Sequence, residues 1–160
     1  MTIKYIDIHS HLNFKDYAGD LKEVIKRMEE KGVATIVVGT GLESSKEAIE
    51  LAEKYENIFA CIGVHPADDK NSLFDEKDFV ALATKPQCVA VGECGLYYFR
   101  LEGDVEAKKN RQKKEFVKQI EFSIKYKKPL MLHLRYSVDD KDGVYEDAYE
   151  LLKSYEGKAH

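Results

Sequence analysis

Short apolar runs rich in β-branched residues alternate along the chain with segments whose apolar residues recur at helical spacing. The short runs predict buried strands, and five are expected, over residues 2–9, 34–38, 58–64, 88–94 and 130–134. Each is followed by a stretch long enough for a helix. Continuous apolar strands that alternate with helices are typical of a parallel sheet, so we expect an α/β protein.

The helical segments carry their own start and stop signals. Ser44-x-x-Glu47 has the form of a capping box, which predicts a helix that opens at Ser44. The other expected helices run from Leu21 to Lys31-Gly32, over residues 74–84, over a long segment with core positions 116–124 that ends before Pro129, and over residues 144–155. A sixth strand is expected to begin at residues 158–160.

Composition narrows the class of protein. A chain of 160 residues with 44% hydrophobic and 34% charged residues fits one folded domain, so residues 1–160 are expected to form a single domain. The net charge of −4 gives no basic surface of the kind that sequence-independent nucleic-acid binders show. Three cysteines without compact spacing predict reduced, buried thiols and a cytoplasmic protein. Nothing approaches the ~20 apolar residues of a membrane span, so no membrane is expected as a partner.

Every histidine of the chain falls at or just after the end of an expected strand. The five are His9, His11, His65, His133 and His160. Active sites of parallel α/β folds form at the carboxyl ends of their strands. Alternate residues of a strand share a face, so His9 and His11 can converge on one point. Imidazole suits Zn, Mn, Fe and Ni, which makes a metal ion the natural bridge, although His-x-His alone is also compatible with a polar turn.

A single carboxylate stands at the end of the fourth expected strand. Glu93 lies between Gly92 and Gly95, and burying it without a partner would be costly. It therefore either reaches solvent or binds metal, with one oxygen available for each of two ions. The two glycines would let other groups approach it closely.

Five motifs in order carry a family resemblance. They are Ile-Asp-Ile-His-Ser-His-Leu, Gly-Val-His-Pro, Gly-Glu-Cys-Gly-Leu, Arg-Gln-x-x-x-Phe and Pro-Leu-x-Leu-His-x-Arg. Together they resemble the TatD family of metal-dependent deoxyribonucleases, within the amidohydrolase-like hydrolases. The resemblance implies a parallel (β/α) barrel of the TIM type, here truncated after about five to six strands, that hydrolyses phosphodiester bonds of DNA.

The resemblance also assigns roles to individual positions. The implied ligands of two divalent ions, drawn from Zn, Mn, Mg, Fe or Ni, are His9, His11, Glu93, His133 and His160. Glu93 would bridge the ions and act as the catalytic group. The implied substrate contacts are His65, Arg100 and Arg135, because a guanidinium is suited to bidentate contact with phosphate.

The chain also departs from the family pattern. Tyr97 stands where the family usually has aspartate, and Tyr136 follows the His-x-Arg motif. A complete barrel of this kind has ~250 residues. These 160 residues would form only part of such a barrel, so DNA cleavage by them is expected to be slow. Two alternatives therefore stay open: a hydrolase of amides or lactones on the same scaffold, and a non-catalytic fragment that binds metal or a partner. A truncated barrel exposes sheet edges, which predicts self-association.

Overall fold

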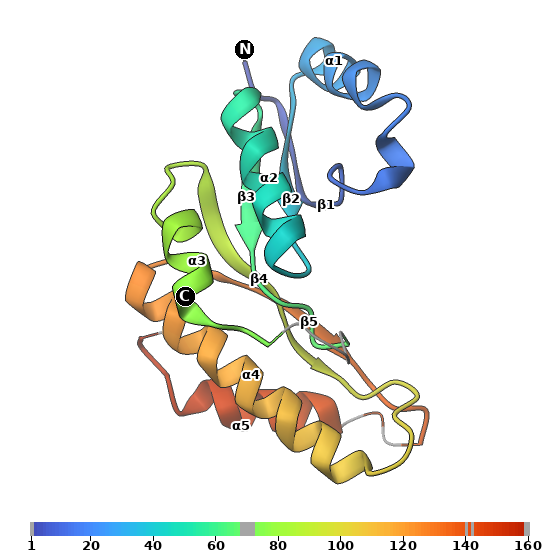
Figure 1. Cartoon of the computed structure of the whole chain (residues 1–160), viewed down its shortest axis with the longest axis vertical. Helices are drawn as coiled ribbons and strands as arrows, with labels where there is room; N and C mark the ends of the chain where they lie inside the picture. The colour runs from blue at the N-terminus through green and yellow to red at the C-terminus, as the bar shows by residue number, and fades with distance from the viewer. Residues whose placement is uncertain (1, 68–72, 140, 142, 159–160) are drawn as a thin grey trace.

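Five parallel strands form one sheet whose spatial order follows the chain, β1-β2-β3-β4-β5 (Figure 1). The computed structural model describes residues 2–67, 73–139, 141 and 143–158. The strands are β1 (Tyr5–Ser10), β2 (Val33–Val38), β3 (Ile58–Ile62), β4 (Cys88–Tyr97) and β5 (Leu130–Arg135). The helices are η1 (Lys15–Tyr17), α1 (Leu21–Lys31), α2 (Leu42–Lys54), α3 (Glu76–Ala83), α4 (Val105–Tyr126) and α5 (Gly143–Lys153).

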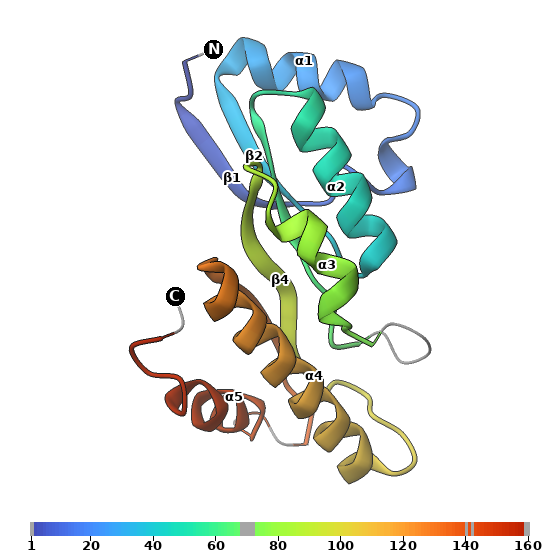
Figure 2. The same ribbon diagram turned by 60° about the vertical axis from the view of Figure 1, so that its left-hand side comes forward.

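The sheet curves, and helices α1 to α4 lie along one side of it (Figure 2). Sequential order of parallel strands with helices between them is the arrangement of a (β/α) barrel, of which this chain forms about half. The expected α/β fold of truncated TIM-barrel type is thus confirmed. All five strands and five helices predicted from the pattern are present, and their ends differ by a few residues, apart from the early start of α4. None of the helices described is long and apolar enough to cross a membrane.

Local signals fix the helix ends. Gly32 closes α1 in the left-handed conformation, with φ at 72°, and its N–H donates to the carbonyl of Glu29. Asp75 and Asp104 cap α3 and α4 by accepting hydrogen bonds from Lys77 N–H and Ala107 N–H. These helices cover the outer side of the sheet, where two hydrophobic clusters fill the space beneath α1–α3 and beneath α4–α5.

The capping prediction at Ser44 is wrong in its position. Helix α2 already begins at Leu42, after Gly41 in extended conformation. Ser44 is therefore the third helical residue, and its Oγ accepts hydrogen bonds from the N–H groups of Thr40 and Gly41. The Ser44 hydroxyl therefore satisfies N–H groups of the residues that precede α2, and it does not cap N–H groups inside the helix. The start of α2 accordingly lies upstream of Ser44.

The prediction that β1 is buried is also wrong. Ile6 and Ile8 are 60% and 67% exposed, and all six residues of the strand are exposed or half-buried. Within the described part of the chain, β1 pairs only with β2, so it forms an edge of the sheet. The apolar sequence of β1 predicts a strand whose side chains are suited to burial. Whether they are buried depends on the elements that pack against the strand.

The predicted burial of three unpaired cysteines is confirmed. Cys61, Cys88 and Cys94 are free and buried. Burial raises the pKa of Cys88 to about 11 and also raises the pKa values of the other two thiols. These thiols are protonated and unreactive at neutral pH. His160 and the expected sixth strand lie at residues 158–160, of which 159 and 160 are outside the described residues.

Candidate metal centre

Glu93 is the centre of a histidine cluster at the carboxyl end of the sheet. It lies in β4 and is only 5% exposed. Burial alone would raise its pKa, but a hydrogen bond with His133 and the nearby imidazoles of His65 and His9 outweigh this and lower the pKa. Glu93 is therefore a carboxylate at neutral pH, held among groups that favour its charge.

One side of Glu93 faces the end of β1. Its Oε2 lies 3.4 Å from His9 Nε2 and 3.8 Å from His11 Nε2, and these two nitrogens are 3.3 Å apart. We call these three residues the edge triad. The expected convergence of His9 and His11 is confirmed, although the register between β1 and β2 shifts between Asp7 and Ser10.

The other side of Glu93 faces β3 and β5. Its Oε1 makes a short hydrogen bond with His133 Nδ1 and lies 3.9 Å from His65 Nε2. We call His65, Glu93 and His133 the central triad. In both triads the candidate ligand atoms lie within 4.8 Å of one another, and Glu93 belongs to both.

Hydrogen bonds distinguish the two flanking histidines. His11 Nδ1 lies 3.1 Å from the carbonyl of Val38, so it carries a proton and leaves the lone pair of Nε2 available to a cation beside Glu93. Metal-binding histidines are usually oriented in this way. In His65 the relation is reversed, because Ala67 N–H donates to Nδ1. The proton of the neutral ring is then on Nε2, which makes His65 a hydrogen-bond donor toward the site.

Glycines bring β5 close enough for His133 to reach Glu93. A Cβ atom at Gly92 would lie 2.4 Å from the carbonyl oxygen of Met131, and one at Gly95 would lie 2.4 Å from that of His133. Both glycines have positive φ, 151° and 139°. The close approach expected at these glycines is confirmed. The groups that approach are backbone carbonyls of β5, one of which belongs to the candidate ligand His133.

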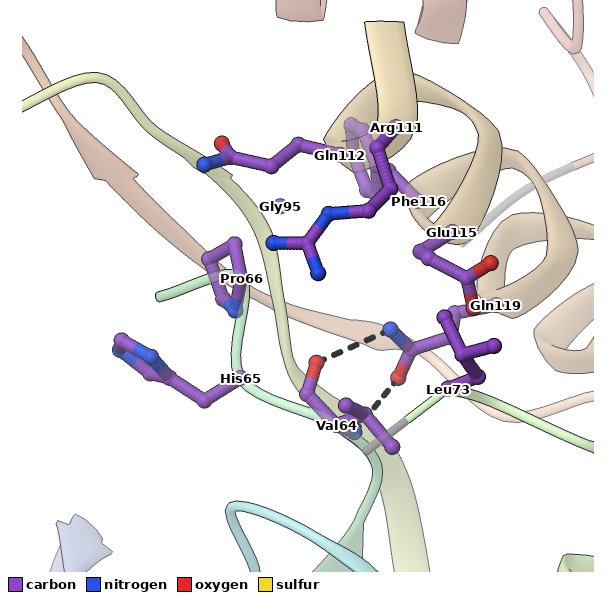
Figure 3. A pocket seen from close by; sticks show the side chains of 10 residues that line it. All are labelled: Val64, His65, Pro66, Leu73, Gly95, Arg111, Gln112, Glu115, Phe116 and Gln119. Carbon is purple, nitrogen blue, oxygen red and sulfur yellow. Dashed lines mark hydrogen bonds between the residues drawn. The ribbon is translucent and has the colours of Figure 1, made fainter. Parts of the chain in front are cut away.

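Two glutamines of α4 were missed by the sequence interpretation. The Gln119 amide accepts a hydrogen bond from Val64 N–H (2.9 Å) and donates one to Val64 O (3.0 Å; Figure 3). The Gln112 amide makes the same pair with Tyr97 N–H (2.7 Å) and Tyr97 O (2.9 Å). We call these pairs the amide clamps. They stand seven residues apart on the buried face of α4; Gln119 fixes the backbone directly before His65, and Gln112 fixes it four residues after Glu93.

The clamps hold the strand ends from behind. Figure 3 shows Gln119 and Arg111 on one side of the segment that follows β3, with His65 pointing away from them. A cavity of only about 20 Å³ remains between them. On the opposite side lies an open depression of about 460 Å³, lined by His11, His65, Glu93 and His133 of the triads together with Phe14, Thr40 and Ala67. The available sequence signal was a polar residue on the core face of a helix, at both 112 and 119.

The two arginines expected to contact substrate are not members of either triad. The guanidinium carbons of Arg100 and Arg135 are 4.7 Å and 5.0 Å from the centre of the Phe99 ring. Both arginines are exposed, at the ends of β4 and β5. The structure thus brings together His9, His11, His65, Glu93 and His133, and it places Arg100 and Arg135 on neighbouring surface.

The donor set fits divalent cations that accept nitrogen ligands. The edge triad offers two imidazoles and one oxygen of Glu93, and the central triad offers His133 and the other oxygen of Glu93, a combination suited to Zn, Mn, Fe or Ni. His133 Nε2 is buried and has no hydrogen-bond partner within the described residues. Such an orphan nitrogen is costly unless a ligand satisfies it, which supports a cation here.

Comparison with known proteins identifies the family of this chain. The family model described as TatD related DNase matches residues 6–160. The chain is 32% identical over 131 residues to the 3'-5' ssDNA/RNA exonuclease TatD of Shigella flexneri, covering 81% of this chain and 49% of that protein. It is 35% identical over 136 residues to YabD of Bacillus subtilis, an uncharacterized metal-dependent hydrolase, covering 84% and 52%.

A solved structure gives the same answer. The crystal structure of YjjV, a TatD homologue from Escherichia coli K12, superposes with a TM-score of 0.77 at 28% sequence identity. It covers 97% of this chain and 57% of YjjV. The chain spans about half the length of the relatives it matches. From its motifs, fold and family match, the chain belongs to the TatD-related DNase family.

Proposed function

We propose that residues 1–160 form one metal-dependent hydrolase domain that cleaves phosphodiester bonds of nucleic acid at a dinuclear centre. The observation that supports this most is the position of Glu93. One of its oxygens faces the edge triad and the other faces the central triad. A carboxylate placed in this way can bridge two cations and offset their charge. The relatives named as nucleases and as metal-dependent hydrolases support the same reaction class.

The candidate ligands have defined roles in this proposal. His9 and His11 hold one cation, His133 holds the other, and Glu93 binds both as the catalytic carboxylate. Two cations at such a centre neutralise the phosphodiester and supply hydroxide near neutral pH. His160, outside the described residues, is the further ligand implied by the family motif. The chemistry of these ligands favours Zn, Mn, Fe or Ni over Mg, which prefers oxygen ligands.

Substrate contact falls to three other groups. The Nε2–H of His65 points toward Glu93 from the rim of the depression and can donate to a phosphate oxygen. Arg100 and Arg135 can present paired N–H donors to the next phosphates. Two guanidinium groups favour a phosphodiester substrate over an amide or a lactone.

A cleavage assay with controlled metal content tests the proposal. Protein purified without chelator is assayed on labelled single-stranded DNA with Mn²⁺, with Mg²⁺ and with EDTA, beside Glu93→Ala. We expect slow cleavage that needs Mn²⁺ and Glu93. Cleavage of dipeptides or lactones instead would support the amide or lactone alternative. Metal binding without any hydrolysis would support the non-catalytic alternative.

The exposed edge of β1 supports a second copy of the chain as a partner. Its exposed Ile6 and Ile8 and unpaired backbone groups offer a strand-pairing surface. Sedimentation of the parent and of Ile8→Lys at several concentrations tests this, and we expect the lysine to weaken association. The reduced thiols fit a protein that works in the cytoplasm.

A further inference from the structure

A cluster of rings and guanidinium groups stands directly beside the central triad. The ring of Tyr97 stacks on His133, with 5.7 Å between centres and 28° between planes. Phe99 meets Tyr97 edge-on at 6.2 Å. The cluster is completed by Tyr136, whose ring centre lies 6.0 Å from the guanidinium carbon of Arg135. We call Tyr97, Phe99, Arg100, Arg135 and Tyr136 the aromatic platform.

Two members of the platform stand on regular structure. Tyr97 and Arg135 are register partners at the ends of β4 and β5. The next residue, Tyr98, donates its N–H to the carbonyl of Arg135 at 2.7 Å. Gln112 clamps both backbone groups of Tyr97. Tyr97 and Arg135 are therefore presented in fixed positions relative to His133, and Phe99, Arg100 and Tyr136 lie in the segments that follow the two strands.

Packing does not explain these rings. None of the three belongs to the hydrophobic clusters that fill the core of the described residues. Tyr97 and Phe99 are half-buried, and Tyr136 is 38% exposed. Exposed cation–π pairs contribute only ~0.5–1 kcal/mol each, too little to account for three rings and two arginines as a stability device.

Half-exposed rings interleaved with guanidinium planes suit one class of ligand. Unpaired nucleobases stack on aromatic side chains and on arginine faces, and this binding tolerates any base. We propose that the aromatic platform is a nucleobase-stacking subsite, which takes a base next to the phosphodiester held at the triads. This inference rests on the proposed function. It implies a substrate whose bases are already unpaired, because a base inside a duplex cannot reach the platform.

The platform also combines the two positions at which the chain departs from its family pattern. Tyr97 and Tyr136 both contribute rings to it, on either side of Phe99 and Arg135. Arg135 can stack through its face while its N–H groups contact a phosphate. Base and phosphate contacts therefore fall to the same surface, and neither excludes the other.

A binding experiment without metal tests the subsite separately from catalysis. Fluorescence anisotropy in EDTA compares labelled oligo(dT) with an oligomer of equal length in which every residue is abasic. The parent should prefer oligo(dT) by at least ~10-fold, in line with the usual worth of stacking a base on an aromatic ring. Phe99→Leu should remove most of this preference, and Phe99→Trp should keep it.

Tyr5→Leu is the matched control, because Tyr5 is exposed at the opposite end of β1. It should keep the full preference for oligo(dT). Equal affinity of the parent for the two probes, or an unchanged preference in Phe99→Leu, would overturn the subsite. Either result can occur alongside Glu93-dependent cleavage, which would leave the proposed function intact. A preference for bases without cleavage by any metal would support the subsite and refute the nuclease.

Discussion

The two triads share Glu93, yet the strands that carry their histidines are held in very different ways. The edge triad takes His9 and His11 from and just after β1, all of whose residues are exposed or half-buried. The central triad takes Glu93 and His133 from β4 and β5, where two glycines let the backbones meet closely. The amide clamps fix the chain beside His65 and beyond Glu93. The central triad is therefore preorganised, whereas the edge triad depends on the pairing of one edge strand.

Removing the shared carboxylate should have the largest effect. Glu93→Ala should abolish tight metal binding at both triads, a loss of more than ~100-fold, because one carboxylate serves both. His133→Ala should empty only the central triad, and His9→Ala only the edge triad. Calorimetric titration with Zn²⁺ or Mn²⁺ measures the number of ions bound.

Glu43→Ala is the control for this series, since that side chain is 80% exposed on α2. It should bind metal as the parent does. If Glu93→Ala and His133→Ala lose the same number of ions, Glu93 does not bridge and the two triads do not share a ligand.

The same contrast applies to stability. Ile62 in β3 is fully buried, and Ile62→Ala should lower the free energy of unfolding by ~2–5 kcal/mol because it leaves a cavity. Ile8→Ala removes the same atoms from an exposed position and should change that free energy by less than ~0.5 kcal/mol. Urea unfolding at low protein concentration measures both. Similar losses would mean that β1 is covered in solution.

Removing one of the amide clamps should lower the free energy of unfolding by an intermediate amount. It should also weaken metal binding at the central triad in particular. Gln119→Leu keeps the volume but leaves Val64 N–H and Val64 O without partners, at a cost of ~1–3 kcal/mol. The central triad should also bind Co²⁺ more weakly, with an altered absorption spectrum, because His65 follows Val64 and its Nε2 lies 3.9 Å from the Glu93 oxygen of that triad. Gln112→Leu should cost similar stability through Tyr97 instead.

Gln119→Glu separates the two parts of this clamp. The carboxylate can still accept from Val64 N–H, but it cannot donate to Val64 O. We expect it to restore the stability and the spectrum only partly. A loss of stability in Gln119→Leu with an unchanged cobalt spectrum would mean that the clamp supports the fold and does not position His65.

Most of the fold could be predicted from the sequence because strand and helix patterns are local. Apolar runs located all five strands, and the position of histidines at strand ends located the site. The burial of β1 could not be predicted, because the same apolar run suits a central strand or an edge strand. Burial is decided by neighbours that the run does not contain.

The clamps could not be predicted for a related reason. Gln119 bonds to a residue 55 positions earlier in the chain, and Gln112 to one 15 positions earlier. A glutamine in a helix has ordinary helix propensity, so only its place on the buried face set it apart. Which backbone groups it satisfies depends on where β3 and β4 end in space. The tautomer of His11 depends in the same way on a tertiary partner, the carbonyl of Val38.

The smallest expected effect concerns a support found only near the central triad. Asp147 of α5 accepts hydrogen bonds from Tyr98 Oη–H (2.8 Å) and Lys113 Nζ (2.7 Å), which tie α5 to β4 and α4. Burial would raise the pKa of Asp147, but these two hydrogen bonds outweigh it and lower the pKa. A carboxyl group with a lowered folded-state pKa stabilises the fold above its unfolded pKa of ~3.9 and loses this contribution as the pH falls through the folded value. Asp147→Asn should therefore be less stable than the parent at pH 7, by up to ~1 kcal/mol for a pair that solvent partly screens. The difference should disappear in acid. Urea unfolding of both proteins at neutral pH and at a pH near 3 measures it, and Lys113→Met should show the same trend. A difference that stays constant with pH would mean that Asp147 supports α5 by its shape and not by its charge. The central triad would then be held in place by β4, β5 and the amide clamps, without a contribution from the charge of Asp147.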